Sequence, residues 1–148
     1  MNKHPEDIVR AARGWIGTPY VHQASTKRAG TDCLGLLRGV WRELYGQEPE
    51  PVPAYSMDWS EPQGEERMWD AARHHLIEKP ATLIHAGDVL LFRMRTGSVA
   101  KHLGIAAGQD AHLSFVHAYS RYGVVESALS LPWRRRVVAC FEFPSEDL

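Results

Sequence analysis

The most constraining feature of this sequence is segment 30–37, Gly-Thr-Asp-Cys-Leu-Gly-Leu-Leu, where turn-forming residues give way to an apolar helical pattern. Behind Cys33, apolar residues recur at helical spacing while charged residues fall largely on the other side, which predicts an amphipathic helix. The apolar positions are Leu36, Leu37, Val40, Trp41 and Leu44. We therefore expect Cys33 in the first turn of a helix that packs on a core.

A cysteine at a helix start differs chemically from one elsewhere. The unpaired N–H groups and the positive end of the helix dipole favour an anion there, so we expect a lowered pKa for the Cys33 thiol. The same N–H groups could stabilise an oxyanion. A lone cysteine is most often only a small buried hydrophobe, so its role depends on a base elsewhere in the chain.

Two histidines in predicted strands are candidates for that base. If Gln109-Asp110 is a two-residue hairpin turn, the register sets His102 opposite His117. Directly opposed residues share a face with Cβ atoms about 5 Å apart, so one imidazole can orient the other. A nucleophilic cysteine needs a base and a polar group that orients the base. Cys33, His102 and His117 supply one of each.

The order of the predicted elements indicates the fold class. Helical patterns come first, over residues 8–16, from 33 onward and over 65–79, and a Pro-rich connection spans 46–64. Short apolar runs typical of strands follow at residues 89–93, 102–107, 113–118, 124–128 and 137–143. This order predicts an α+β fold in which N-terminal helices pack on an antiparallel sheet of about five strands, in a single domain over residues 1–148.

Composition and missing motifs exclude several classes of function. A formal charge of −1 on 148 residues argues against general nucleic-acid binding, and no apolar run approaches the ~20 residues of a membrane-spanning helix. We expect synthesis in the cytoplasm without a signal peptide. The chain lacks a phosphate-binding loop and paired Cys-x-x-Cys or His-Glu-x-x-His spacings, so we expect no metal and no cofactor. Cys140, the second cysteine, lies in a strand pattern and is expected in the core.

Five short motifs occur in order along nearly the whole chain. They are Gly-Thr-Pro-Tyr at 17–20, Asp-Cys-Leu-Gly-Leu at 32–36, Gly-Asp-Val-Leu-Leu-Phe at 87–92, His-Leu-Gly-Ile at 102–105 and Val-His-Ala at 116–118. In this order they resemble the NlpC-type cysteine peptidases, which are papain-like cell-wall hydrolases. The Cys-Leu-Gly form, followed by Arg-Gly-Val-Trp-Arg-Glu at 38–43, resembles their phage-encoded branch.

The resemblance implies a role for individual residues. It makes Cys33 the nucleophile, His102 the base and His117 the group that orients the base. Tyr20 would face the cleft as an oxyanion donor together with the Cys33 amide, and Asp32 would help to hold the amino end of the substrate. Relatives usually carry serine directly after the cysteine, whereas this chain has leucine there, so the exact specificity is open.

The implied reaction is cleavage of the bond between D-glutamate and the diamino acid in peptidoglycan stem peptides. The implied partners are those stem peptides and phage tail proteins, and the protein would act on the cell wall as part of a phage particle. Two alternatives stay open: an amidase or acyltransferase with the same triad, and a non-catalytic tail component that binds the wall. The basic run Trp133–Arg136 is either a solvated strand start or a grip for a phosphate or carboxylate.

Overall fold

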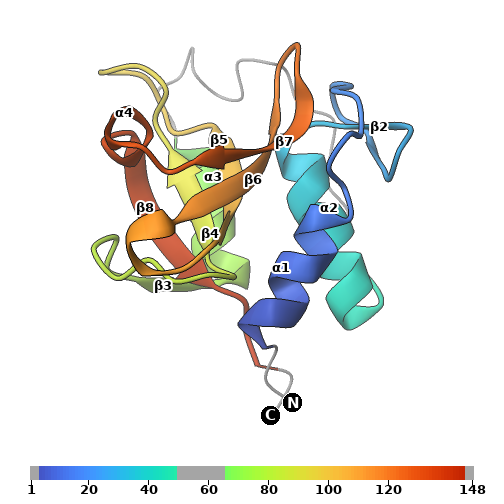
Figure 1. Cartoon of the computed structure of the whole chain (residues 1–148), viewed down its shortest axis with the longest axis horizontal. Coiled ribbons are helices and arrows are strands. Elements are labelled where there is room, and N and C mark those ends of the chain that lie inside the picture. Colours follow the sequence, from blue (N-terminus) through green and yellow to red (C-terminus); the bar gives the residue numbers. More distant parts are fainter. Residues whose placement is uncertain (1–3, 50–65, 146–148) are drawn as a thin grey trace.

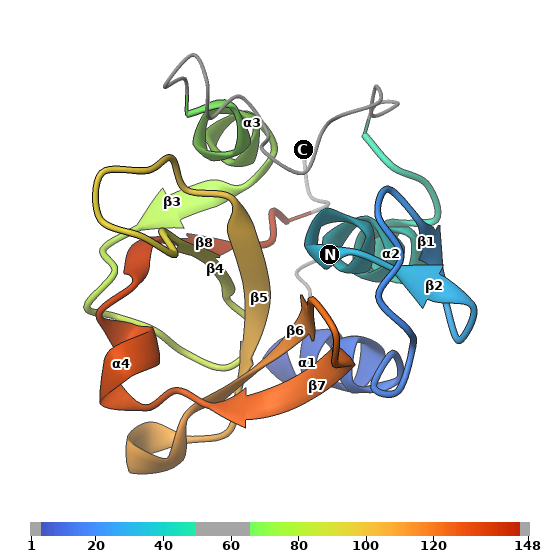
Figure 2. The same cartoon turned by 90° about the horizontal axis from the view of Figure 1, so that it is seen from above.

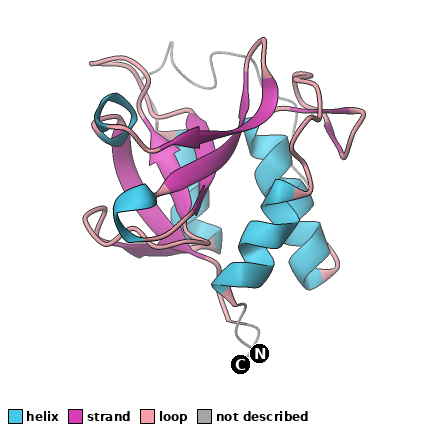
Figure 3. Cartoon of the chain, viewed as in Figure 1, coloured by secondary structure: helices cyan, strands magenta, loops and turns pink. Residues whose placement is uncertain are grey.

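The structure, a computed structural model, describes residues 4–49 and 66–145. Helices α1 (Pro5–Arg13) and α2 (Cys33–Tyr45) come first, and a six-stranded antiparallel sheet follows (Figure 1, Figure 3). The strands, in the spatial order β3-β8-β4-β5-β6-β7, are β3 (Ile77–Lys79), β8 (Val137–Glu142), β4 (Val89–Phe92), β5 (His102–Ala107), β6 (Ser114–Tyr119) and β7 (Gly123–Ala128). The predicted α+β class is confirmed, with one strand more than about five.

Helix α2 starts where its sequence provides a cap. The side chain of Asp32 accepts a hydrogen bond from the Gly35 backbone N–H, which satisfies one of the unpaired donors of the first turn. Gly35 also lets the preceding loop lie directly against the helix, because a Cβ there would collide with the carbonyl oxygen of Ala24. Loop and helix start therefore form one compact unit around Cys33.

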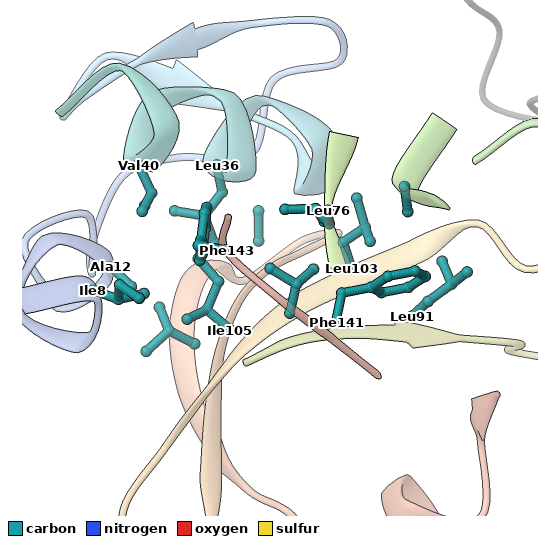
Figure 4. Packing of buried hydrophobic residues seen from close by; sticks show 14 of the residues in the cluster. Ile8, Ala12, Leu36, Val40, Leu76, Leu91, Leu103, Ile105, Phe141 and Phe143 are labelled. Carbon is teal, nitrogen blue, oxygen red and sulfur yellow. The ribbon is translucent and has the colours of Figure 1, made fainter. Parts of the chain in front are cut away.

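The two faces of the sheet carry separate hydrophobic clusters, because alternate residues of β4 point to opposite sides. The larger cluster lies between the sheet and helices α1, α2 and α3 (Arg67–His75) (Figure 4), and it includes Ile8, Ala12, Leu36, Val40, Leu91, Leu103, Ile105 and Phe141. The smaller cluster includes Leu90, Phe92, Phe115 and Cys140. Trp133 of α4 (Leu131–Arg134) packs against it, and α4 lies across the sheet from α1 and α2 (Figure 2).

The predicted third helix, over residues 65–79, is too long. Helix α3 ends at His75, and Leu76 has an extended backbone with φ −121° and ψ 169°. Residues 77–79 form the edge strand β3 instead, which pairs with β8 and sets Lys79 opposite Cys140. Tertiary pairing with a neighbouring strand outweighs the local helical pattern here, and it supplies the sixth strand.

The β5–β6 register differs by two residues from the predicted one. Ile105 pairs with Val116, a register that does not set His102 opposite His117. The connection is not a two-residue turn, because residues 110–112 form a short 3-10 helix. Since side chains alternate with period two, a shift of two residues still leaves both histidines on one face, as diagonal neighbours.

Three further features complete the description. Strands β1 (Ser25–Thr26) and β2 (Gly30–Thr31) form a small separate sheet that was not predicted. Of the predicted connection 46–64, residues 50–64 lie outside the described residues. None of the helices in the described parts of the chain has the length and apolar character needed to span a bilayer.

Candidate active site

Cys33 is the first residue of α2, and Asp32 holds this helix start in place. One carboxylate oxygen of Asp32 accepts the Gly35 N–H at 2.7 Å, and the other accepts the Gln23 N–H at 2.7 Å. The Nδ1 atom of His22 lies 3.8 Å from that second oxygen. Asp32 is buried, so these hydrogen bonds stabilise a group that would otherwise be costly to desolvate. Asp32 thus positions Cys33, while its predicted contact with a substrate amine stays a prediction.

The half-buried Cys33 side chain lies against the start of β5. Its thiol donates a hydrogen bond to the carbonyl oxygen of Lys101, with an Sγ···O distance of 3.6 Å. Lys101 immediately precedes His102, the first residue of β5. The tertiary structure therefore brings the candidate nucleophile to the strand that carries the candidate base.

The predicted lowered pKa of Cys33 is wrong. Burial, followed by the nearby Asp32 carboxylate, raises the pKa of the thiol to about 12, although backbone N–H groups act in the opposite direction. Those groups belong to Leu103, Leu34 and Cys33 itself. Loss of water around the sulfur outweighs the stabilisation that a helix start offers to an anion. Cys33 is therefore a neutral thiol at pH 7 in the free protein and needs a base to become a nucleophile.

A chain of hydrogen bonds runs from His102 across the sheet. The Nε2 atom of His102 lies 2.8 Å from Nδ1 of His117, and Nε2 of His117 lies 2.9 Å from Oγ of Ser127 on β7. Both imidazoles are buried, His117 completely. Because Nε2 of His102 is engaged, Nδ1 is the ring nitrogen left to exchange a proton with a substrate or a thiol.

The direction of these hydrogen bonds follows from the chemistry required of a base. For Nδ1 of His102 to accept a proton, its Nε2 must carry hydrogen and donate to Nδ1 of His117. His117 then carries its own hydrogen on Nε2 and donates to the Ser127 hydroxyl. In the reverse arrangement Nδ1 of His102 would already be protonated. The Ser127 hydroxyl can accept this hydrogen bond, so all three groups are compatible with the arrangement that leaves Nδ1 of His102 able to accept a proton.

Both imidazoles are neutral at pH 7. Burial, and then the proximity of His117, lower the pKa of His102 to about 3. Burial lowers the pKa of His117 to about 4. The hydrogen-bond chain from His102 to Ser127 requires two neutral imidazoles with one ring hydrogen each. The lowered pKa values of both histidines are consistent with this requirement.

Aromatic side chains surround the two imidazoles and keep water away from them. The Trp133 ring of α4 lies 6.0 Å from the His102 ring and 5.2 Å from the His117 ring, measured between centroids. Tyr119 stacks on His117 with the ring centroids 5.3 Å apart. Phe115, two residues before His117 on the same face of β6, has its ring centroid 4.1 Å from that of His117. This apolar enclosure is the physical cause of the lowered imidazole pKa values.

Sequence reasoning missed Ser127 and Trp133. Ser127 lay in a predicted strand, and a signal was available: in the β6–β7 pairing His117 opposes Val125, which puts Ser127 two residues further along the same face. Trp133 was considered only as part of a basic run. Nothing local in that run indicates that the indole covers the histidines, because α4 reaches them only through the fold.

Tyr20 lies beside the start of α2, where it forms an isolated parallel bridge with Thr31. Burial, and then the nearby Cys33 and Asp32, raise the pKa of its phenol to about 12. The hydroxyl thus keeps its proton at pH 7, and it makes no hydrogen bond to another residue of the described chain. It is available as a donor, and its predicted role at an oxyanion stays a prediction.

Among the described residues, no group of three or more His, Cys, Asp or Glu side chains is arranged to hold a metal ion. The arrangement can instead support nucleophilic chemistry. It combines a thiol at a helix start, an imidazole with one free ring nitrogen, and two further groups that orient that imidazole.

Comparison with known proteins gives a consistent result. A sequence model described as "NlpC/P60 family" matches residues 17–141. A Haemophilus influenzae protein named "Probable endopeptidase" is 27% identical over 119 residues, which cover 80% of this chain and 62% of that protein. The "Gamma-DL-glutamyl hydrolase" of Bacillus subtilis is 30% identical over 138 residues, covering 92% of this chain and 29% of that protein. The chain thus spans less than two thirds of either relative.

Solved structures show the same fold. The NlpC/p60 domain of the peptidoglycan hydrolase SagA superposes with a TM-score of 0.64 at 21% identity, covering 95% of this chain and 100% of that one. An NlpC/P60 family protein from Bacillus cereus superposes with a TM-score of 0.66 at 16% identity, covering 97% of this chain and 41% of that one. At these identities the likeness concerns the fold alone.

Proposed function

The chain belongs to the NlpC/P60 family, and we propose that it is a cysteine peptidase that cleaves the peptide stems of peptidoglycan. The observation that carries this proposal is the hydrogen-bonded chain His102–His117–Ser127, which begins one residue after the Lys101 carbonyl that binds the Cys33 thiol. Two buried, hydrogen-bonded imidazoles beside the strand that receives a helix-start thiol are the groups that a Cys-His nucleophile needs, which supports the proposal.

In the proposed reaction Cys33 transfers its thiol proton to Nδ1 of His102 as the sulfur attacks the substrate carbonyl carbon. The new imidazolium donates from Nε2 to His117, which stabilises the charge that forms. The Cys33 amide at the helix start, together with the Tyr20 hydroxyl, would stabilise the oxyanion. When the C–N bond breaks, His102 returns the Nδ1 proton to the leaving amine, and a thioester remains.

Water completes the cycle. His102, neutral again, takes a proton from water at Nδ1 while the oxygen attacks the thioester carbon. The acid product leaves, and the sulfur recovers the proton from His102. Every proton in this scheme passes through one ring nitrogen, so the scheme depends on the tautomer that His117 and Ser127 maintain.

The substrate proposal has its own support. The names of the two relatives, an endopeptidase and a γ-DL-glutamyl hydrolase, favour a bond next to glutamate, and we propose the D-glutamyl to diamino acid bond. Asp32 is already held by two backbone N–H groups, and Leu34 offers no hydroxyl beside it. Recognition of the substrate amine would therefore rest on the remaining lone pairs of one carboxylate.

We also propose that the protein acts at the cell wall together with phage tail proteins, on the sequence resemblance of residues 33–35 and 38–43. Co-purification with tail proteins encoded beside it tests this. Purification of intact tails that lack the protein would contradict it.

Digestion of purified muropeptides, with products identified by mass spectrometry, tests the activity. We expect the wild type to release fragments with a new glutamyl carboxyl group and a new diamino-acid amine. Cys33→Ala should release none, iodoacetamide should abolish the activity, and EDTA should leave it intact. An amidase would yield a cut elsewhere, an acyltransferase would yield transfer products, and a wall-binding tail component would yield no products at all.

A further inference from the structure

Residues 133–136, the basic run Trp-Arg-Arg-Arg after β7, contribute side chains to two different sites. Trp133 covers the catalytic histidines, as described above. Arg135 and Arg136, at the end of α4, line a cavity of about 720 Å³ together with the β4–β5 connection and Glu66. Arg134, in the same run, does not line it. The fold therefore places neighbouring arginines in different surroundings.

The cavity has more positive charge than its own residues neutralise. Glu66 is occupied: it accepts the Arg93 guanidinium at 3.1 Å and the Ala100 backbone N–H at 2.9 Å. Arg135 makes no side-chain hydrogen bond or ion pair with any residue of the described chain. The Arg136 guanidinium lies over the Trp133 ring, 5.3 Å from its centre. Two guanidinium groups thus line the cavity without a carboxylate partner among residues 4–49 and 66–145.

Two segments connect the residues that line the cavity to the residues of the candidate active site. Ser98 and Val99 line it, and two residues further along the chain the Lys101 carbonyl binds the Cys33 thiol. On the other side Arg136 stacks on Trp133, whose ring packs against His102. The β4–β5 connection on one side and Trp133 on the other therefore link these arginines to the residues of the proposed site.

We propose that this cavity binds a free carboxylate of the substrate peptide, with Arg135 and Arg136 as the ligands. A guanidinium fork matches the two oxygens of a carboxylate. This inference rests on the proposed function, and it adds a subsite to it. A γ-linked glutamate keeps its α-carboxylate free, a dicarboxylic diamino acid keeps a second carboxylate, and the last residue of the stem ends in a third. The stem peptide therefore offers three sources of this group.

Binding of synthetic stem tetrapeptides to the full-length Cys33→Ala protein, measured by calorimetry, tests the proposal. Four peptides separate the sources: the free acid, and three that are amidated singly at the glutamyl α-carboxylate, at the diamino acid or at the C-terminus. We expect Arg135→Gln to weaken binding of the free acid about 3- to 10-fold, and Arg135→Lys to weaken it less. Arg134→Gln is the matched control and should bind like the parent. Circular dichroism checks that each variant is folded.

The amidated peptides identify which carboxylate enters the cavity. Amidation of the carboxylate that enters the cavity should weaken binding by a similar factor and remove the effect of Arg135→Gln. Equal effects of Arg135→Gln on all four peptides, or equal effects of Arg134→Gln and Arg135→Gln, overturn the assignment. Cleavage of the free acid by the wild type is assayed in parallel. If the peptide is cleaved but its binding ignores Arg135, the subsite fails and the activity stands; if it is neither cleaved nor bound, both fail.

Discussion

The two cysteines of this chain are similar in acidity and different in surroundings. Burial is the largest cause that raises the pKa of each thiol to about 12, and each lies near a buried aspartate, Asp32 for Cys33 and Asp88 for Cys140. The aspartate contributes to the raised pKa in both cases. Acidity therefore does not distinguish Cys33, the proposed nucleophile, from Cys140.

The difference lies in what surrounds each sulfur. Cys140 lies within β8, fully buried, and its thiol donates to a carboxylate oxygen of Asp88 at 3.4 Å. Lys79 contacts the same oxygen at 2.8 Å, so this carboxylate is already part of an ion pair. Cys33 is partly exposed at a helix start, next to the strand of a neutral imidazole pair. Access and a nearby imidazole pair, rather than acidity, distinguish the two thiols.

The largest expected effect comes from the same substitution at the two cysteines. Cys33→Ala should abolish muropeptide cleavage, because no other group can form the thioester. Cys140→Ala should retain most activity and lose about 1–2 kcal/mol of unfolding free energy, since it removes buried contacts from the core. Product analysis and denaturant unfolding measure the two effects. Equal activity of the two variants would contradict the assignment of Cys33.

The next effect separates the two histidines near Cys33. His102→Ala removes proton transfer both to the leaving amine and from the attacking water, so kcat/KM should fall about 10²–10⁴-fold. His117→Ala leaves the base but frees its ring to change tautomer, and the loss should be smaller. His117→Asn and His117→Gln still present a carbonyl acceptor to His102 and should retain more activity than alanine.

The histidine variants are compared by steady-state cleavage of a stem tetrapeptide, with circular dichroism as the control for folding. A folded His117→Ala protein as active as the wild type would contradict the orienting role. An active His102→Ala protein beside a dead His117→Ala protein would reverse the two roles.

Alkylation by iodoacetamide at different pH values sharpens the comparison of the thiols. A folded-state pKa of about 12, above the ordinary value of 9.0, leaves little thiolate at neutral pH. The rate at Cys33 in the free protein should therefore rise about tenfold per pH unit between pH 7 and 9. The rate at Cys140 should stay lower throughout, because its sulfur is fully buried. Peptide mapping gives both rates, and a plateau for Cys33 near neutral pH would instead indicate a preformed thiolate.

The smallest expected effect concerns Ser127. Ser127→Ala removes the acceptor for Nε2 of His117 and lets the imidazole pair adopt the inactive tautomers, so kcat should fall about 3- to 10-fold with little change in KM. Ser127→Thr keeps the hydroxyl and should restore most of the rate. Ser120→Ala, which alters an exposed hydroxyl in the β6–β7 turn, is the control. A loss that Ser127→Thr does not restore would point to packing instead.

The sequence allowed the fold class and the three residues Cys33, His102 and His117 to be singled out, because these depend on local patterns. Helical spacing behind Cys33 and alternation in the strands reflect burial on one face, which each segment encodes by itself. The predicted contact between His102 and His117 is present although the predicted β5–β6 register is wrong. Because side chains alternate along a strand, a shift of two residues kept both histidines on one face of the sheet. A shift of one residue would have placed them on opposite faces.

Only the tertiary structure determines the properties that depend on several elements at once. The pKa of Cys33 is set by burial between α2 and β5, which overrides the local effect of the helix start. Ser127, Trp133 and Arg135 reach the site or its border only because β7 and α4 fold onto β5 and β6. Desolvation and long-range contacts have no local signature, whereas hydrophobic periodicity and helix caps are written within a few residues of one another.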